Sequence, residues 1–271
     1  MKKLLILFTI LFILLNGKPV PAQENLKTFK DRVTPYYYCL ENMPVKNFTC
    51  LFTTSEYVNF ARENYDSSFT YPLKLTWIKN GRVYYTLQPY PTKMDSTRRR
   101  IFLTQVQLVT NQFKGFLLDW QNFMLYSPLS DIPDSAEIKA GHDTIQVVYT
   151  SGEGKLMAHV KKLFLPSGKL IQVTVWSGSG KVVNYPIYIE LEDKWVCSGW
   201  NSQIYENGQI SSGIANRMEL RKIGDYWMPI RVDMLVQTSK KAEEKFLSTI
   251  FMKEFIFDVP LQEINGPPAP K

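Results

Sequence analysis

The chain has 271 residues, a formal net charge of +7, 45% hydrophobic residues, 14% aromatic residues and 21% charged residues. This composition excludes a disordered or collagen-like chain, and the length is sufficient for a full core without disulfide bonds. The modest charge favours solubility and gives no sign of a nucleic-acid partner.

The first 22 residues have the layout of a secretory signal peptide. Met1-Lys2-Lys3 precedes an apolar run from Leu4 to Leu15, and Val20-Pro21-Ala22 places small residues before a cleavage point at Gln23. The alternative is a membrane anchor, but the run is shorter than the roughly 20 residues that a spanning helix needs. We therefore expect residues 1–22 to be cleaved and the mature protein to be periplasmic or secreted. Without them, 29 basic and 25 acidic residues remain, a net charge of about +4.

The next elements in chain order are a helix, a strand and a hairpin. Apolar residues at steps of three and four predict a helix over 24–43, within which Pro35 can bend or end it. A strand over 45–52 follows, and residues 55–64 are compatible with a short helix. Asn80-Gly81 joins predicted strands at 73–78 and 83–88, because both turn residues favour positive φ.

A second amphipathic helix is predicted over 103–124, where an apolar stripe again steps by three and four. The cluster Arg98-Arg99-Arg100 lies just before it. These arginines suit contact with anionic lipid head groups or with the acidic residues of an envelope protein partner. The alternative is a solvated helix start, which the helix dipole makes slightly unfavourable.

From residue 137 onward strands dominate, separated by short turns. The short connections predict an antiparallel meander with strands at 144–149, 155–165, 169–176, 182–191, 195–205, 209–221, 227–236 and 246–258. Several of these strands are apolar on both faces, so both faces need cover. We predict a mainly β (α+β) fold: one domain over 23–263, in which a curved antiparallel sheet of about eleven strands forms a half-barrel covered by two amphipathic helices. Residues 264–271 form a proline-rich tail that we expect to be flexible.

Two helices cannot fill a large curved sheet, so the sequence predicts an apolar groove between sheet and helices. The aromatic residues that we expect to line it share a place on the concave side or the helix seam: Tyr37, Trp77, Tyr85, Phe113, Phe116, Trp120, Trp176 and Trp195. Each of them, taken singly, is also an ordinary core residue.

Catalytic and metal-binding patterns are absent from the sequence. No G-x-S-x-G or H-E-x-x-H motif occurs, and the only histidines are His142 and His159. We expect no enzyme activity, no cofactor and no metal. Cys39 and Cys50 are candidates for a disulfide in an oxidising compartment, and the alternative is three buried thiols that include Cys197.

The layout resembles the LolA-like outer-membrane lipoprotein carriers. The resemblance rests on short matches: Asn47-Phe48-Thr49-Cys50 entering a strand after the first helix, the strand Tyr71 to Trp77, Leu165 to Leu170, Tyr226 to Val232, and Phe255 to Pro260. It implies a half-barrel of about eleven strands with a helical lid, whose cavity takes acyl chains of a lipid or lipoprotein. The family's cavity arginine corresponds to either Arg82 or Arg98, and the long aromatic helix among the early strands departs from the family pattern.

These observations favour a non-catalytic periplasmic carrier or binding protein for a lipid, an acyl chain or another apolar ligand. An envelope interaction protein with a filled core is the alternative. A secreted hydrolase is a weaker one, because no nucleophile or convergent acid pair stands out.

Overall fold

The computed structural model describes residues 24–91, 93–153, 157–178, 180–238 and 245–260, without the side chain of Arg82. The predicted signal peptide and the tail at 264–271 lie outside these ranges. The described α-helices are α2 (Leu26–Val33), α3 (Ser55–Asn64) and α4 (Ser96–Trp120). The strands are β1 (Asn47–Thr54), β2 (Leu73–Ile78), β3 (Arg82–Leu87), β4 (Glu137–Ala140), β5 (Ile145–Ser151), β6 (Ala158–Phe164), β7 (Leu170–Ser177), β8 (Gly180–Leu191), β9 (Lys194–Glu206), β10 (Gln209–Ile223), β11 (Tyr226–Thr238) and β12 (Lys245–Phe257).

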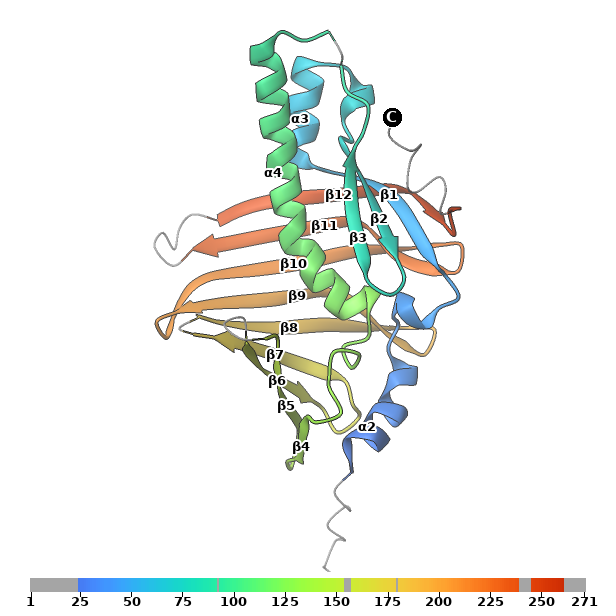
Figure 1. The fold of residues 1–271 in the computed structure, drawn as a ribbon, viewed down its shortest axis with the longest axis vertical. Coiled ribbons are helices and arrows are strands. Elements are labelled where there is room, and N and C mark those ends of the chain that lie inside the picture. The colour runs from blue at the N-terminus through green and yellow to red at the C-terminus, as the bar shows by residue number, and fades with distance from the viewer. Residues whose placement is uncertain (1–23, 92, 154–156, 179, 239–244, 261–271) are drawn as a thin grey trace, which may run out of the picture.

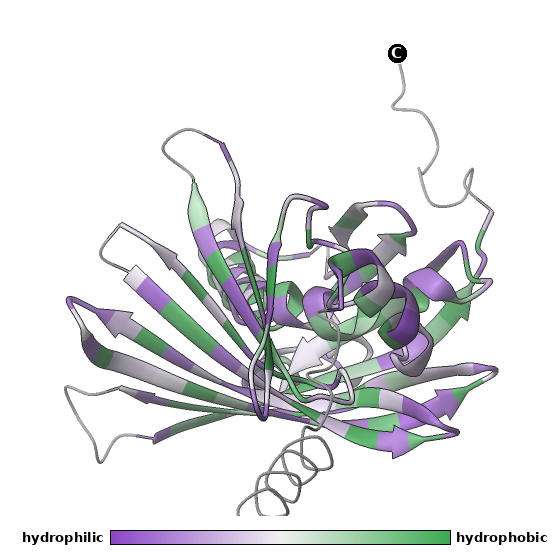
Figure 2. Cartoon of the chain, turned by 90° about the horizontal axis from the view of Figure 1, so that it is seen from below, coloured by the Kyte–Doolittle hydropathy of each residue, from purple (hydrophilic) through white to green (hydrophobic). Residues whose placement is uncertain are grey.

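All twelve strands form one open antiparallel sheet in the order β3-β2-β1-β12-β11-β10-β9-β8-β7-β6-β5-β4. The sheet curves into a half-barrel, and the helices lie on its concave side (Figures 1 and 2). The predicted fold class is therefore confirmed. The described residues hold three α-helices where two were expected, and twelve strands where about eleven were expected.

Tight turns of the predicted kind join the strands. Asn80 and Gly81 both have positive φ, 71° and 119°, and so do Asn207 and Gly208 between β9 and β10, 52° and 80°. Such turns match the right-handed twist of the strands on either side of them. The strand that the sequence analysis did not place is β4, a four-residue edge strand paired only with β5.

The first helix is shorter than predicted. It ends at Val33 and is followed by a 3₁₀ turn over Thr34–Tyr36, because Pro35 within that turn has no N–H to continue an α-helix. Tyr37 then adopts an extended conformation and pairs with Trp195 of β9 in a parallel bridge. The prediction of one helix over 24–43 was thus wrong beyond Val33.

The long helix begins earlier than predicted. Asp95 caps α4 by accepting a hydrogen bond from the N–H of Arg98 at 2.8 Å. The helix runs to Trp120 and continues as a π-helical turn over Gln121–Leu125. Arg98, Arg99 and Arg100 therefore belong to its first turns. In Figure 1, α3 and the N-terminal half of α4 project beyond the edge of the curved sheet, while the C-terminal half crosses the concave face.

Candidate functional site

The space between α4 and the sheet is filled by aromatic side chains. Phe113 stacks on Phe52 of β1 with ring centroids 3.9 Å apart, and Phe116 stacks on Trp200 of β9 at 5.4 Å. Trp120 is fully buried beside Phe116. Three of the predicted cavity residues, Phe113, Phe116 and Trp120, therefore lie together and contact other side chains of the chain itself.

Trp77 and Tyr85 extend this aromatic core toward β2 and β3. Trp77 is fully buried, stacks on Phe48 at 5.5 Å, and donates its indole N–H to the Tyr126 hydroxyl at 3.2 Å. Tyr85 is half-buried, with its ring edge toward Phe52. Trp77 thus belongs to the packed core and Tyr85 packs against it, whereas the sequence analysis expected both to line a groove.

Tyr37 and Trp195 form a second aromatic group, where the N-terminal segment crosses β9. Their rings meet edge to face at 5.2 Å. The Tyr37 hydroxyl donates to the Gly168 carbonyl and accepts from the Leu170 N–H, and burial raises the pKa of this phenol. These contacts fix the chain around Tyr37 to β7 and β9, which is a structural role.

Trp176 lies apart from the other candidates. It lines a hollow of about 540 Å³ with Lys161, Thr174 and Tyr205. Val173 and Val175 of the same strand line a different hollow, beside the π-helical turn on the concave side. Because successive residues of a strand face opposite sides, Trp176 points away from the concave face. The structure therefore does not bring it to the predicted groove.

A group of polar side chains lines the concave face along one flank of α4. Asn184, Ser202 and Asn216 are less than 9% exposed, and their Oδ1, Oγ and Oδ1 atoms have no hydrogen-bond partner in the described part of the chain. Asn184 and Ser202 are direct cross-strand neighbours in β8 and β9. Asn216 of β10 pairs with Trp200, two residues from Ser202 and on the same face.

The helix supplies the opposite side of this group. The Asn184 amide donates to Asp119 at 3.3 Å, and the Gln112 Oε1 atom is buried without a partner among the described residues. Asp119 and Gln112 are seven residues apart, about 10 Å along a helix, which matches the spacing of about 10 Å between β8 and β10. We call these five residues the polar seam: Gln112, Asp119, Asn184, Ser202 and Asn216.

Burial raises the pKa of Asp119 to about 6, and the nearby Trp200 indole lowers it by a smaller amount. The unpartnered atoms of the seam are amide oxygens, apart from one hydroxyl, and the only ionisable group is this carboxyl. Such a set accepts hydrogen bonds, so it suits a group that donates them. The sequence analysis missed the seam, because it treated several strands as apolar on both faces and did not single out the polar side chain of Asn184.

An apolar surface continues from the seam across the sheet. The register pairs Ser202 with Ile214, Ile214 with Val236, and Val236 with Phe246, so these side chains share the concave face. Ile214 and Val236 are half-buried and Phe246 is 48% exposed. We call Ile214, Val236 and Phe246 the apolar shelf.

A smaller hollow of about 210 Å³ lies at the other end of the seam, where α4 gives way to the π-helical turn. Asn184, Phe123, Asp131 and Lys162 line it. Lys162 is buried, forms an ion pair with Asp131, and donates to the Pro128 carbonyl at 2.7 Å. Burial lowers the pKa of Lys162, and Asp131 opposes that effect. The pair holds the loop after α4 against β6.

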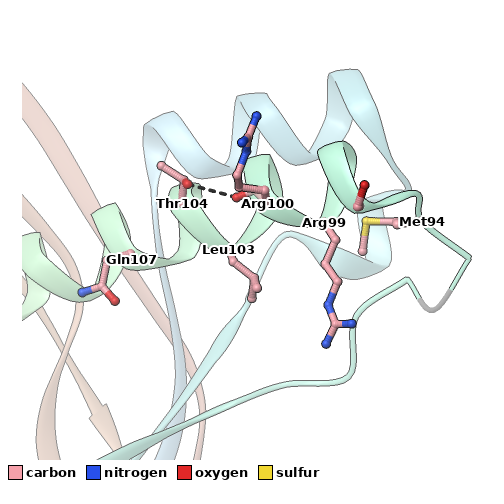
Figure 3. A pocket seen from close by; sticks show the side chains of 7 residues that line it. Met94, Arg99, Arg100, Leu103, Thr104 and Gln107 are labelled. Atoms are coloured by element: carbon pink, nitrogen blue, oxygen red, sulfur yellow. Dashed lines mark hydrogen bonds between the residues drawn. The ribbon is translucent and has the colours of Figure 1, made fainter.

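The arginine cluster lines a groove of about 660 Å³ on the exposed part of α4 (Figure 3). Arg99 and Arg100 lie there with Leu103 and Met94. Arg98 is outside the lining and sits near its own cap, with its Nε atom 3.8 Å from Asp95. The predicted cluster thus divides, with two of its three members at the groove.

The three cysteines are buried free thiols. The structure therefore does not contain the candidate bridge between Cys39 and Cys50. Burial raises the pKa of all three thiols, and that of Cys39 is raised further by Glu41 and Cys197. Cys39 follows Tyr37 by two residues, as Cys197 follows Trp195, so the parallel bridge brings Cys39 toward Cys197.

Within the described ranges, no cluster of three or more metal-ligating side chains occurs, and no helix is long and apolar enough to cross a membrane. Comparison with known protein families, curated proteins and solved structures finds no match to this chain. The LolA-like resemblance stays a prediction, and the function has to be argued from the site itself.

Proposed function

We propose that this protein is a non-catalytic binding protein for an amphiphile, exported by its N-terminal segment and similar in role to the LolA-like carriers. The single observation that supports this function most is the adjacency of the polar seam and the apolar shelf on one concave face. An acyl chain or similar apolar group would lie on Ile214, Val236 and Phe246. A hydrogen-bond donor at its end would meet Asn184, Ser202 and Asn216.

This arrangement places the ligand beside α4 and not beneath it. The space beneath α4 holds Phe113, Phe116 and Trp120, and removing such side chains from their contacts costs several kcal/mol. The flank needs a smaller rearrangement, because its aliphatic groups are already half-exposed and only the side chains that cover the buried, unpartnered polar atoms have to move. Burying alkyl groups there gains about 0.8 kcal/mol per CH₂.

The test uses two adjacent residues on opposite faces of β12. Phe246 belongs to the shelf, whereas Leu247 is 62% exposed and points to the other face. We expect the protein to bind a fluorescent long-chain fatty amine, and Phe246→Glu to weaken binding about tenfold or more. Leu247→Glu introduces the same charge and should leave the affinity unchanged.

Lipid extraction and mass spectrometry of protein purified from its periplasm or medium should find a bound amphiphile. Protein that carries no ligand and binds no long-chain probe would contradict the proposal, as would equal losses in the two variants. That result would favour the second candidate, an envelope interaction protein, which the filled space beneath α4 supports.

A further inference from the structure

The N-terminal half of α4 carries an exposed aliphatic surface. Ile101, Leu103 and Leu108 are 46%, 41% and 50% exposed. The buried residues of the same stretch, Phe102, Val106 and Val109, face α3 and the sheet. With 3.6 residues per turn, Ile101 and Leu108 share one side of the helix, whereas Leu103 lies about 150° away on the side of Arg99, so it is Leu103 that adjoins the basic residues.

All the charged side chains that precede Asp119 on this helix have one sign. From Ser96 to Leu118, α4 contains Arg98, Arg99, Arg100 and Lys114 and no acidic residue. Arg99 contacts the Tyr90 hydroxyl at 3.4 Å, and neither Arg99 nor Arg100 has a carboxylate partner among the described residues. Basic side chains at a helix N-terminus oppose the helix dipole, so helix stability does not explain their place here.

The groove on the exposed part of α4 combines aliphatic side chains with positive charge. It is lined by Arg99, Arg100, Leu103 and Met94, with Ser96, Thr104 and Gln107 completing the wall. Figure 3 shows Leu103 and Arg99 extending from the same side of the helix. Aliphatic side chains next to long basic ones are typical of helices that lie in a membrane interface, where the stems enter the apolar boundary and the guanidinium groups contact phosphates.

We propose that the N-terminal half of α4 docks the protein on an anionic lipid surface. Leu103 and Met94 enter the interface, while Arg99 and Arg100 bind lipid phosphates at the groove. The position of this segment beyond the sheet edge leaves it accessible to a flat surface (Figure 1). The positive charge of Arg99 and Arg100 matches the negative potential of such a surface.

The experiment is flotation of the full chain with vesicles of phosphatidylcholine alone or with 30% phosphatidylglycerol. We expect binding only to the anionic vesicles, with strong loss at high salt. Arg99→Gln/Arg100→Gln should lower binding about tenfold or more. Arg221→Gln/Lys245→Gln removes the same charge from exposed strand positions and should bind as the unaltered protein does.

Insertion of Leu103 is measured separately. Leu103→Cys labelled with a polarity-sensitive fluorophore should show a blue shift with anionic vesicles, whereas Leu247→Cys should show none, and the buried native thiols should not react. Leu103→Ser should weaken binding while circular dichroism stays unchanged, and Leu108→Ser, on the other side of the helix, should bind as the unaltered protein does. Phe246→Glu, altered only at the apolar shelf, should still bind vesicles, which separates this proposal from the proposed function.

Three results would overturn the docking proposal. One is no preference of the unaltered protein for anionic vesicles. Another is an equal loss in both charge variants, since that indicates a general effect of net charge. The last is salt-sensitive binding to an acidic polypeptide without any to vesicles, which would assign the groove to a protein partner.

Discussion

Asp119 is the only acidic residue of α4, and it lies between the helix and the sheet. Its folded pKa of about 6 is above the value of 3.8 that it has in an unfolded chain. Between these values the folded state holds a proton that the unfolded state has released. The folded state therefore loses stability as the pH rises through this window.

We expect urea unfolding of the unaltered protein to show this loss between pH 4 and pH 6, on the order of 2–3 kcal/mol. Asp119→Asn keeps a similar shape without the charge, so its stability should fall less across the same range. The measurement is the unfolding free energy of both proteins at half-unit pH steps. Parallel curves for the two proteins would show that Asp119 is not the group responsible.

The thiols give a prediction at the same scale. Because Cys39, Cys50 and Cys197 are buried and burial raises their pKa values, none should react with a thiol reagent such as dithionitrobenzoate in the folded protein at pH 8. Denatured protein, purified from an oxidising compartment without reductant, should show three reactive thiols. One reactive thiol in denaturant would mean that two cysteines are bridged, and peptide mapping would then identify the pair.

At the scale of elements, α4 has one buried apolar face and, apart from it, exposed aliphatic residues with a different role. Phe113 is fully buried on Phe52, whereas Leu108 is 50% exposed. Phe113→Ala should lower the unfolding free energy by about 3–5 kcal/mol, because it leaves a cavity in a packed core. Leu108→Ala should change it by less than about 0.5 kcal/mol. Similar losses in the two variants, measured by urea unfolding, would contradict the assignment of the faces.

The elements differ in how far the sequence predicts them. The hairpin at Asn80-Gly81 and most strands from β5 to β12 follow from turn residues and local patterns, so their positions are confirmed within a few residues. Pro35 marks the end of α2 locally, but the extended course of the chain after it depends on the pairing of Tyr37 with Trp195, a contact across more than 150 residues that no local pattern contains. The start of α4 was placed too late, because the three arginines and the preceding prolines resemble a loop while Asp95 is the cap.

Candidate site residues show the same division between local and distant information. Sequence patterns identified the aromatic side chains of α4, but they cannot show whether such residues line a cavity or fill a core. That depends on Phe52 and Trp200 from strands at distant places in the chain. The polar seam was missed for the same reason, since Asn184, Ser202 and Asn216 are unremarkable until the register aligns them beside Asp119.

At the scale of the whole molecule, β1, the first strand in the chain, pairs with β12, the last. β1 lies between β2 and β12, so the N-terminal hairpin joins the meander only through contacts of about 200 residues in separation. One cluster of buried residues extends from α2 to β12 without a break. A shared core of this kind links the stability of the two ends of the sheet.

We therefore expect tryptophan fluorescence and far-ultraviolet circular dichroism to report a single, coincident urea transition. Ile250→Ala, at a fully buried position of β12, should shift both curves equally. Two separate transitions would show that the N-terminal hairpin and the meander unfold independently.

The order of the strands has a mechanical consequence for α4. The helix follows β3 and precedes β4, and these two strands are the opposite edges of the sheet. The chain thus connects α4 to both edges of the sheet, and the helix crosses the concave face between them. Such a helix cannot swing out as a lid hinged at one end. Moving the helix away from the sheet would pull on both edge strands at once. The distance between helix and sheet and the curvature of the half-barrel would therefore change together.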